Sequence, residues 1–98
     1  MIVVTQSGNQ LTASGHAGFA PHGSDIVCAA FSAVLQTFLA SMEELTTDAI
    51  KTDIAVGKAV IEYGNLTEQG KLLLDSFFVG VRGIAASYPE HIKIVTEP

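Results

Sequence analysis

The sequence predicts a single domain of the α+β class, an α/β sandwich in which two helices pack on one mixed or mainly antiparallel sheet. The chain has 98 residues, which is near the commonest domain size. Five short strand-like segments and two long helical patterns follow one another in the order ββαββαβ. Hydrophobic residues make up 48% of the chain, which is enough to fill one core between these layers and to leave apolar surface for a partner.

The first two strands are predicted to form a hairpin. Residues 2–6 are rich in β-branched side chains, and the polar turn "SGNQ" separates them from residues 11–17. Apolar and polar residues alternate in the second segment, so successive side chains should point to opposite faces of the sheet. This alternation places His16 at the end of the polar face.

A loop and a long helix follow the hairpin. Residues 18–24 read "GFAPHGS", with two glycines, a proline and no periodicity, which is typical of a loop. Ser24 or Asp25 is expected to cap the helix by accepting a hydrogen bond from a free backbone N–H. The helix should end near Leu45, before a pair of threonines. Because it is apolar almost all round, we expect it to be covered on most sides.

The second half of the chain predicts two more strands, a helix and a last strand. Residues 49–54 and 58–63 flank the turn "AVG", and residues 68–87 form the second helical pattern after Thr67. The apolar side chains at helical spacing that should face the core are Leu72, Leu73, Phe77, Val81, Ile84 and Tyr88. The last strand is predicted at 91–96, with His91 at the surface.

Charge and cysteine content narrow the function classes. The formal charge of −5 leaves no basic patch that could neutralise phosphates, so no direct nucleic-acid partner is expected. A single cysteine cannot form an internal disulfide, and the first ten residues lack the basic start and apolar run of a signal peptide. The longest apolar stretch, residues 26–42, is interrupted by polar side chains and is short for a membrane span. We therefore expect a cytoplasmic protein with no membrane partner.

The chemistry of the chain is concentrated in residues 14–34, which hold the only cysteine and two of the three histidines. With a cap at residue 24 or 25, Cys28 falls in the first helical turn, where free N–H groups and the helix dipole stabilise a thiolate. The connection from strand through loop to helix returns the chain, so His16 can meet the thiol as a general base. The backbone N–H groups of Cys28 and of the Gly23 loop are candidate oxyanion donors. These parts predict a cysteine hydrolase.

Each of these residues also has a purely structural explanation. A lone cysteine in an apolar helix is most often a small buried hydrophobic residue. Asp25 can be a helix cap, a catalytic orienter or both, and Ser32 can be a packing residue bonded to its own helix. His22, in a loop flanked by glycine and proline, is expected to be exposed rather than to act as a base.

A metal site is a weaker interpretation of the same stretch. The ligand types of zinc sites are present in His16, His22, Asp25 and Cys28. Their spacing fits no zinc pattern with paired ligands, and the glycines match neither nucleotide-binding fingerprint. We therefore expect no metal and no cofactor.

The run "GHA" at residues 15–17, followed by "GSDIVCAAFSAV" at residues 23–34, resembles the signature of the ribosomal-processing cysteine protease family, Prp. The resemblance extends over the whole chain, to the "YPEHIKIV" after the second helix. It implies one cysteine-protease domain, residues 1–98, with Cys28 as nucleophile and His16 as base. The implied supporting residues are Gly15, Asp25, Ser32 and Gly23. The implied mobile substrate loop contains Gly18, Phe19, Ala20, Pro21 and His22, of which Phe19 is expected to form an apolar wall of the site.

The resemblance also implies a function. Members of the family are bacterial homodimers that remove the N-terminal extension of large-subunit ribosomal protein twenty-seven, cutting after paired phenylalanines. The expected partner is therefore a protein substrate, and the expected intermediate is a thioester acyl-enzyme. The alternative is a non-catalytic, dimeric, ribosome-associated binding module in which Cys28 is structural.

Overall fold

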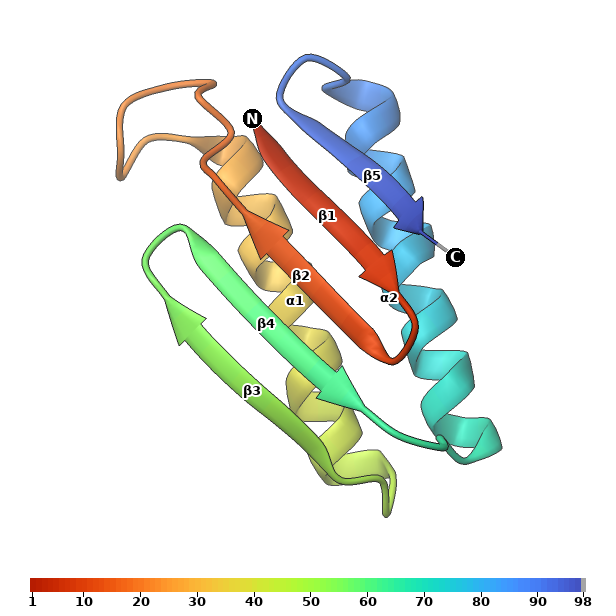
Figure 1. The fold of residues 1–98 in the computed structure, drawn as a ribbon. Coiled ribbons are helices and arrows are strands. Elements are labelled where there is room, and N and C mark those ends of the chain that lie inside the picture. The colour runs from red at the N-terminus through yellow and green to blue at the C-terminus, as the bar shows by residue number, and fades with distance from the viewer. Residues whose placement is uncertain (98) are drawn as a thin grey trace.

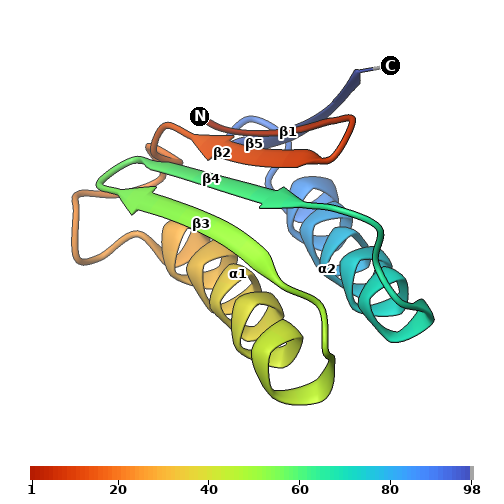
Figure 2. The same ribbon diagram turned by 60° about the horizontal axis from the view of Figure 1, so that its bottom comes forward.

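A computed structural model describes residues 1–97 of the chain. In chain order its elements are β1 (Ile2–Ser7), β2 (Gln10–Ser14), α1 (Ile26–Leu45), β3 (Ile50–Ala55), β4 (Lys58–Tyr63), α2 (Glu68–Ser87) and β5 (Ile92–Glu97). The strands form one sheet in the order β3-β4-β2-β1-β5, and both helices cover the same face of it (Figures 1 and 2). The predicted class, two helices on one mixed sheet, is confirmed.

The mixed character of the sheet comes from its last strand. β1 pairs antiparallel with β2 and parallel with β5, while β4 pairs antiparallel with both β2 and β3. In this register Val4 lies opposite Ala13 on one side and Ile94 on the other, so apolar side chains share the face on which the helices pack. A shift of one residue would turn them to the other face.

The core lies between the sheet and the helix layer. The largest fully buried side chains are Leu11, Met42, Ile61, Ile92, Val4, Val27 and Val81. On the helix side, the ring centroid of Phe77 lies 6.2 Å from that of Phe31 and 5.3 Å from that of Phe38. Aromatic contacts between α1 and α2 therefore join the two helices above the sheet.

α1 has the predicted bounds, but it is less covered than the sequence suggests. The side chains that it buries are Val27, Phe31, Leu35, Phe38 and Met42, which lie at helical spacing on one face. The expectation that it is covered on most sides is wrong. Its other faces carry many alanine, serine and threonine side chains, whose small apolar areas cost little when exposed, and the large apolar side chains of Ile26 and Leu45 are exposed at its two ends. The length of α1 and its mean hydropathy of 1.6 would suffice for a membrane span, but its buried face packs as that of an amphipathic core helix does.

β2 is shorter than predicted, which moves His16 off the strand. β2 ends at Ser14, and Gly15 takes a φ of +91°, outside the β region. A Cβ on Gly15 would clash with the carbonyl oxygen of Met1. The expectation that His16 ends the polar face of β2 is therefore wrong, because a close approach between distant backbone segments breaks the strand just before it.

α2 has the predicted bounds and a slightly different core face. Leu72 is 69% exposed, whereas Leu74 and Phe78 are buried beside the expected Phe77 and Val81. The helix is capped by Thr67, which accepts from the Gly70 N–H. The hydroxyl of Thr67 in turn donates to Asp48 at 2.7 Å and so ties the start of α2 to the segment that follows α1.

Candidate active site

Cys28 is the third residue of α1, and its thiol is half-buried. The backbone N–H of Ala17 donates a hydrogen bond to Cys28 Sγ at 3.3 Å. This N–H and the N-terminal end of a 20-residue helix both stabilise negative charge on the sulfur. The structure thus places Cys28 in the first helical turn, as the sequence predicted, and adds a backbone donor from the segment after β2.

Asp25 is the buried N-cap of α1, and it organises both the helix and the loop. Its Oδ1 accepts from the backbone N–H groups of Val27 and Cys28, each at 3.0 Å. Its Oδ2 accepts from those of Phe19 at 2.9 Å and Ala20 at 3.3 Å. These bonds, that from Cys28 foremost, hold the pKa of the carboxyl below its ordinary value of 3.8 although burial opposes them. Among residues 1–97 no hydrogen bond joins Asp25 to an imidazole. The geometry therefore supports the cap role and gives no support to the orienter role.

The cap changes the predicted oxyanion hole. Because the N–H of Cys28 donates to Asp25, it is not directed at a substrate carbonyl. An ionised carboxylate at the same helix end also disfavours a second negative charge nearby. A thiolate at Cys28 is therefore best stabilised by a neighbouring cation, and the histidines of the site can supply one.

His16 lies in the segment that joins β2 to the loop, and its imidazole is exposed. The N–H of Gly15 donates to the carbonyl of Gly57 at 2.8 Å, which binds this segment to the β3–β4 turn. A Cβ on Gly57 would stand only 2.9 Å from His16 Nε2, so the imidazole rests directly against the turn. His16 and Cys28 line the same cavity. The loop therefore brings the two residues back to one place, as the sequence predicted.

A cavity of about 360 Å³ opens between α1 and the β3–β4 turn. Its polar lining includes His16, His22 and Cys28. Its apolar walls come from Phe31, Leu35 and Leu39 of α1 and from Ile54 and Val56. A neighbouring hollow shares the two histidines and Cys28 and extends under the loop. A thiol and two imidazoles thus lie at the edge of an apolar cavity, which makes this cavity the candidate active site.

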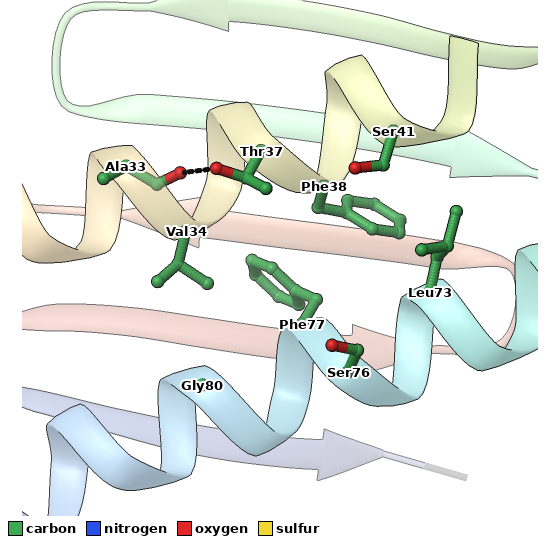
Figure 3. A pocket seen from close by; sticks show the side chains of 9 residues that line it. All are labelled: Ala33, Val34, Thr37, Phe38, Ser41, Leu73, Ser76, Phe77 and Gly80. Carbon is green, nitrogen blue, oxygen red and sulfur yellow. Dashed lines mark hydrogen bonds between the residues drawn. The ribbon is translucent and has the colours of Figure 1, made fainter. Parts of the chain in front are cut away.

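The groove between α1 and α2 is a different feature (Figure 3). It has a volume of about 340 Å³ and lies between apolar side chains and three hydroxyls. One of these hydroxyls, that of Thr37, donates to the carbonyl of Ala33 at 2.7 Å. Among residues 1–97 no titratable side chain lines the groove, so it offers no base that could activate these hydroxyls.

The structure brings most of the predicted site residues together. Those that line the cavity or the neighbouring hollow are Gly15, His16, Gly18, Ala20, His22, Gly23, Asp25, Cys28 and Ser32. Phe19 and Pro21 line neither of them. The apolar wall expected from Phe19 is supplied instead by Ile54 and Val56. Within residues 1–97, no three His, Cys, Asp or Glu side chains are grouped as metal ligands would be.

His91 is the main residue of this region that the sequence does not reveal. The expectation of a surface position is wrong, because His91 is half-buried and its Nδ1 lies 2.9 Å from the carbonyl oxygen of Ala17. Its ring also packs edge-on against Phe19, with centroids 5.3 Å apart. No local pattern predicts a contact between residues 74 positions apart. The only available signal is that His91 is one of three histidines.

Comparison with known proteins identifies the family. The sequence profile described as cysteine protease Prp matches residues 1–93. The chain belongs to this family. It is 37% identical to the ribosomal processing cysteine protease Prp of Mycoplasma pneumoniae over 93 residues, which cover 95% of this chain and 92% of that relative. Membership in the Prp family makes the chain a cysteine peptidase.

Two crystal structures of an essential ribosomal processing protease Prp from S. aureus share the fold. The one in complex with a covalently linked product peptide is 26% identical, with a TM-score of 0.94. The one in complex with a substrate peptide is 25% identical, with a TM-score of 0.82. Each match covers 99% of this chain and the whole of the S. aureus chain. The ββαββαβ arrangement is therefore that of a Prp protease from end to end.

Proposed function

We propose that Cys28 and His16 form a dyad that cleaves a peptide bond through a thioester acyl-enzyme. The observation that carries this proposal is that the only cysteine of a Prp-family chain lies at a helix N-terminus, in a cavity that it shares with an imidazole. A cysteine peptidase with one cysteine has one candidate nucleophile. The covalently linked product peptide of the S. aureus relative supports covalent catalysis.

His16 is favoured over His22 as the base. The residues on both sides of His16 are hydrogen-bonded within the site: Gly15 to the β3–β4 turn and Ala17 to Cys28 Sγ. His22 instead lies in the exposed part of the loop, residues 21–24, which is bent by a hydrogen bond from the Ser24 N–H to the Pro21 carbonyl. A general base works best when its position is fixed.

The proposed mechanism has two steps. Cys28 Sγ attacks the scissile carbonyl as a thiolate, and the C–N bond breaks as the His16 imidazolium donates its proton to the leaving amine. The acyl group is then held as a thioester. His16, now neutral, accepts a proton from water as that water attacks the thioester, and the thiolate leaves. The released acid and the thiolate–imidazolium pair complete the cycle.

The proposed substrate is the N-terminal extension of large-subunit ribosomal protein twenty-seven, cut after paired phenylalanines. Two observations support this choice. The relatives are named as ribosomal processing proteases, and that of S. aureus is described with substrate and product peptides. The cavity beside Cys28 is walled by apolar groups such as Phe31 and Ile54, which suit an aromatic side chain. A cytoplasmic location is part of the same proposal, because it is where a ribosomal substrate would be met.

The dyad is tested with a peptide that contains a Phe-Phe junction. Wild type is compared with Cys28→Ser, His16→Ala and His22→Ala, the last as a matched imidazole control. Cys28→Ser should abolish cleavage, and His16→Ala should lower kcat/KM by about 100-fold or more. His22→Ala should retain most of the activity. Wild-type cleavage at another junction would overturn the substrate choice, and full activity in His16→Ala would overturn the dyad.

A homodimer is part of the same proposal. It is supported by exposed apolar side chains, which include Ile26, Leu45, Ile54, Val56, Leu72 and Val79. Light scattering after gel filtration should give twice the chain mass of 10.3 kDa. A monomer at the concentrations used for cleavage would contradict this part of the proposal and leave the dyad untouched.

A further inference from the structure

The geometry points to His91 as a positioning residue that holds the dyad in place through the backbone of Ala17. This inference rests on the proposed function, because it assigns His91 a role in the same site. His91 belongs to the segment between α2 and β5, at the far end of the chain from the motif that contains Cys28 and His16.

The backbone of His91 is fixed from two sides. Its N–H donates to the carbonyl of Tyr88 at the end of α2, at 3.0 Å. Its carbonyl accepts from the N–H of Ile2 at the start of β1, at 2.9 Å. Ile2 is itself buried in the core. The imidazole therefore projects from a junction of three regular elements, which is the kind of support that holds a site residue accurately.

The side chain uses this support to hold Ala17. The Nδ1 of His91 lies 2.9 Å from the Ala17 carbonyl oxygen. Because a carbonyl oxygen can only accept, Nδ1 must carry the proton of this hydrogen bond. Ala17 is only 2% exposed, so its carbonyl has little access to water and loses its partner when His91 is removed.

Ala17 transmits this contact to both members of the dyad. Its N–H donates to Cys28 Sγ at 3.3 Å, while its carbonyl accepts from His91. The two peptide planes on either side of the Ala17 Cα are therefore both held, and the first of them belongs also to His16. A rotation of the Ala17 backbone would turn its N–H away from the sulfur and move the His16 imidazole with it.

The loop reinforces the same contact. The ring of Phe19 packs edge-on against both His91 and Tyr88, with centroids 5.3 and 5.4 Å away. The N–H of Phe19 is meanwhile held by Asp25. The His91 ring thus has two separable roles, a packing surface for Phe19 and a hydrogen-bond donor for Ala17, and only the second is predicted to act on the dyad.

Three substitutions separate these roles. His91→Phe keeps a ring against Phe19 and removes the donor. His91→Asn removes the ring and keeps an N–H donor at the δ position, where His91 Nδ1 stands. His91→Gln carries its donor one bond further out. For each variant, the measurements are the rate of Cys28 alkylation by iodoacetamide, kcat and KM for the Phe-Phe peptide, and the melting temperature.

We expect His91→Phe and His91→Gln to lower kcat and the alkylation rate by about tenfold, the factor expected for one lost hydrogen bond. KM should stay within a factor of about two because the residues that line the cavity do not include His91. His91→Asn should restore both rates. Equal rates in His91→Phe and wild type would overturn the inference. So would losses that follow the melting temperature in all three variants, since that would show a purely structural role.

The alkylation rates keep this test separate from that of the proposed function. A wild type that cleaves no peptide would refute the proposed substrate. The pattern of alkylation across the three variants would still show whether His91 acts on Cys28.

Discussion

Gly57→Ala should damage the site more than the fold. Gly57 has a φ of +72°, which an L residue adopts at a cost of about 1–2 kcal/mol. The new methyl would stand 2.9 Å from His16 Nε2, whereas ordinary contact begins at 3.4 Å, so the ring must retreat by about 0.5 Å. The imidazole is exposed and can move at little cost in stability. Because a shift of about 1 Å can cost a factor of about 100 in rate, half of it should lower kcat/KM about tenfold.

The matched control is Gly8→Ala in the β1–β2 turn. Gly8 has a similar φ of +56°, and a methyl group added there would meet no heavy atom of residues 1–97 within 4 Å. Both variants should therefore lose about 1–2 kcal/mol in urea unfolding, with a melting temperature lower by several degrees. Only Gly57→Ala should lose peptidase activity. If the two variants cleave the Phe-Phe peptide equally fast, the idea that the β3–β4 turn sets the position of His16 is refuted.

Three further predictions concern stability alone. The pKa of the Asp25 carboxyl is lowered in the folded state, so its contribution to stability is complete above about pH 3.8 and is lost as the pH falls through the folded-state pKa. The melting temperature of Asp25→Asn should therefore fall less steeply than that of wild type as the pH is lowered below about 3.8. Equal slopes of melting temperature against pH would contradict this role of Asp25. In α2, the methyl group of Gly83→Ala would meet no heavy atom of residues 1–97 within 4 Å, so the free energy of unfolding in urea should rise by up to about 1 kcal/mol. Gly70→Ala in the same helix should instead be destabilising, because its methyl would clash with the Asp48 carboxylate that holds Thr67. A rise in the free energy of unfolding equal to that of Gly83→Ala would refute this prediction.

The limits of the helices could be predicted because their signals are local. Asp25 and Thr67 cap the two helices with their own side chains; the sequence predicts a cap at residue 24 or 25 and a helix that begins after Thr67. The placement of Cys28 in the first turn follows from the first cap alone. The end of β2 could not be predicted in this way, since it depends on the approach of Gly15 to the backbone of Met1.

The parallel pairing of β1 with β5 is likewise outside the reach of local patterns. The alternation within each strand predicts which side chains share a face, but not which strand lies beside which. Once β5 lies next to β1, the Ile2 N–H can bond to the His91 carbonyl, and the His91 ring comes within reach of Ala17. The position of His91 and the pairing of β1 with β5 therefore could not be predicted for the same reason, since both depend on contacts between the two ends of the chain.

His16 is consequently placed by parts of the chain that lie outside the sequence motif and follow it. The residue before it is bonded to the β3–β4 turn, and the residue after it is bonded to His91, just before β5. Neither anchor exists until β4 has paired with β2 and β5 with β1. A chain that has formed only the first hairpin and α1 already contains the whole sequence motif, yet it lacks both contacts that hold the segment around His16. The motif thus supplies the groups of the proposed dyad, and the completed sheet supplies the geometry that the proposed reaction needs.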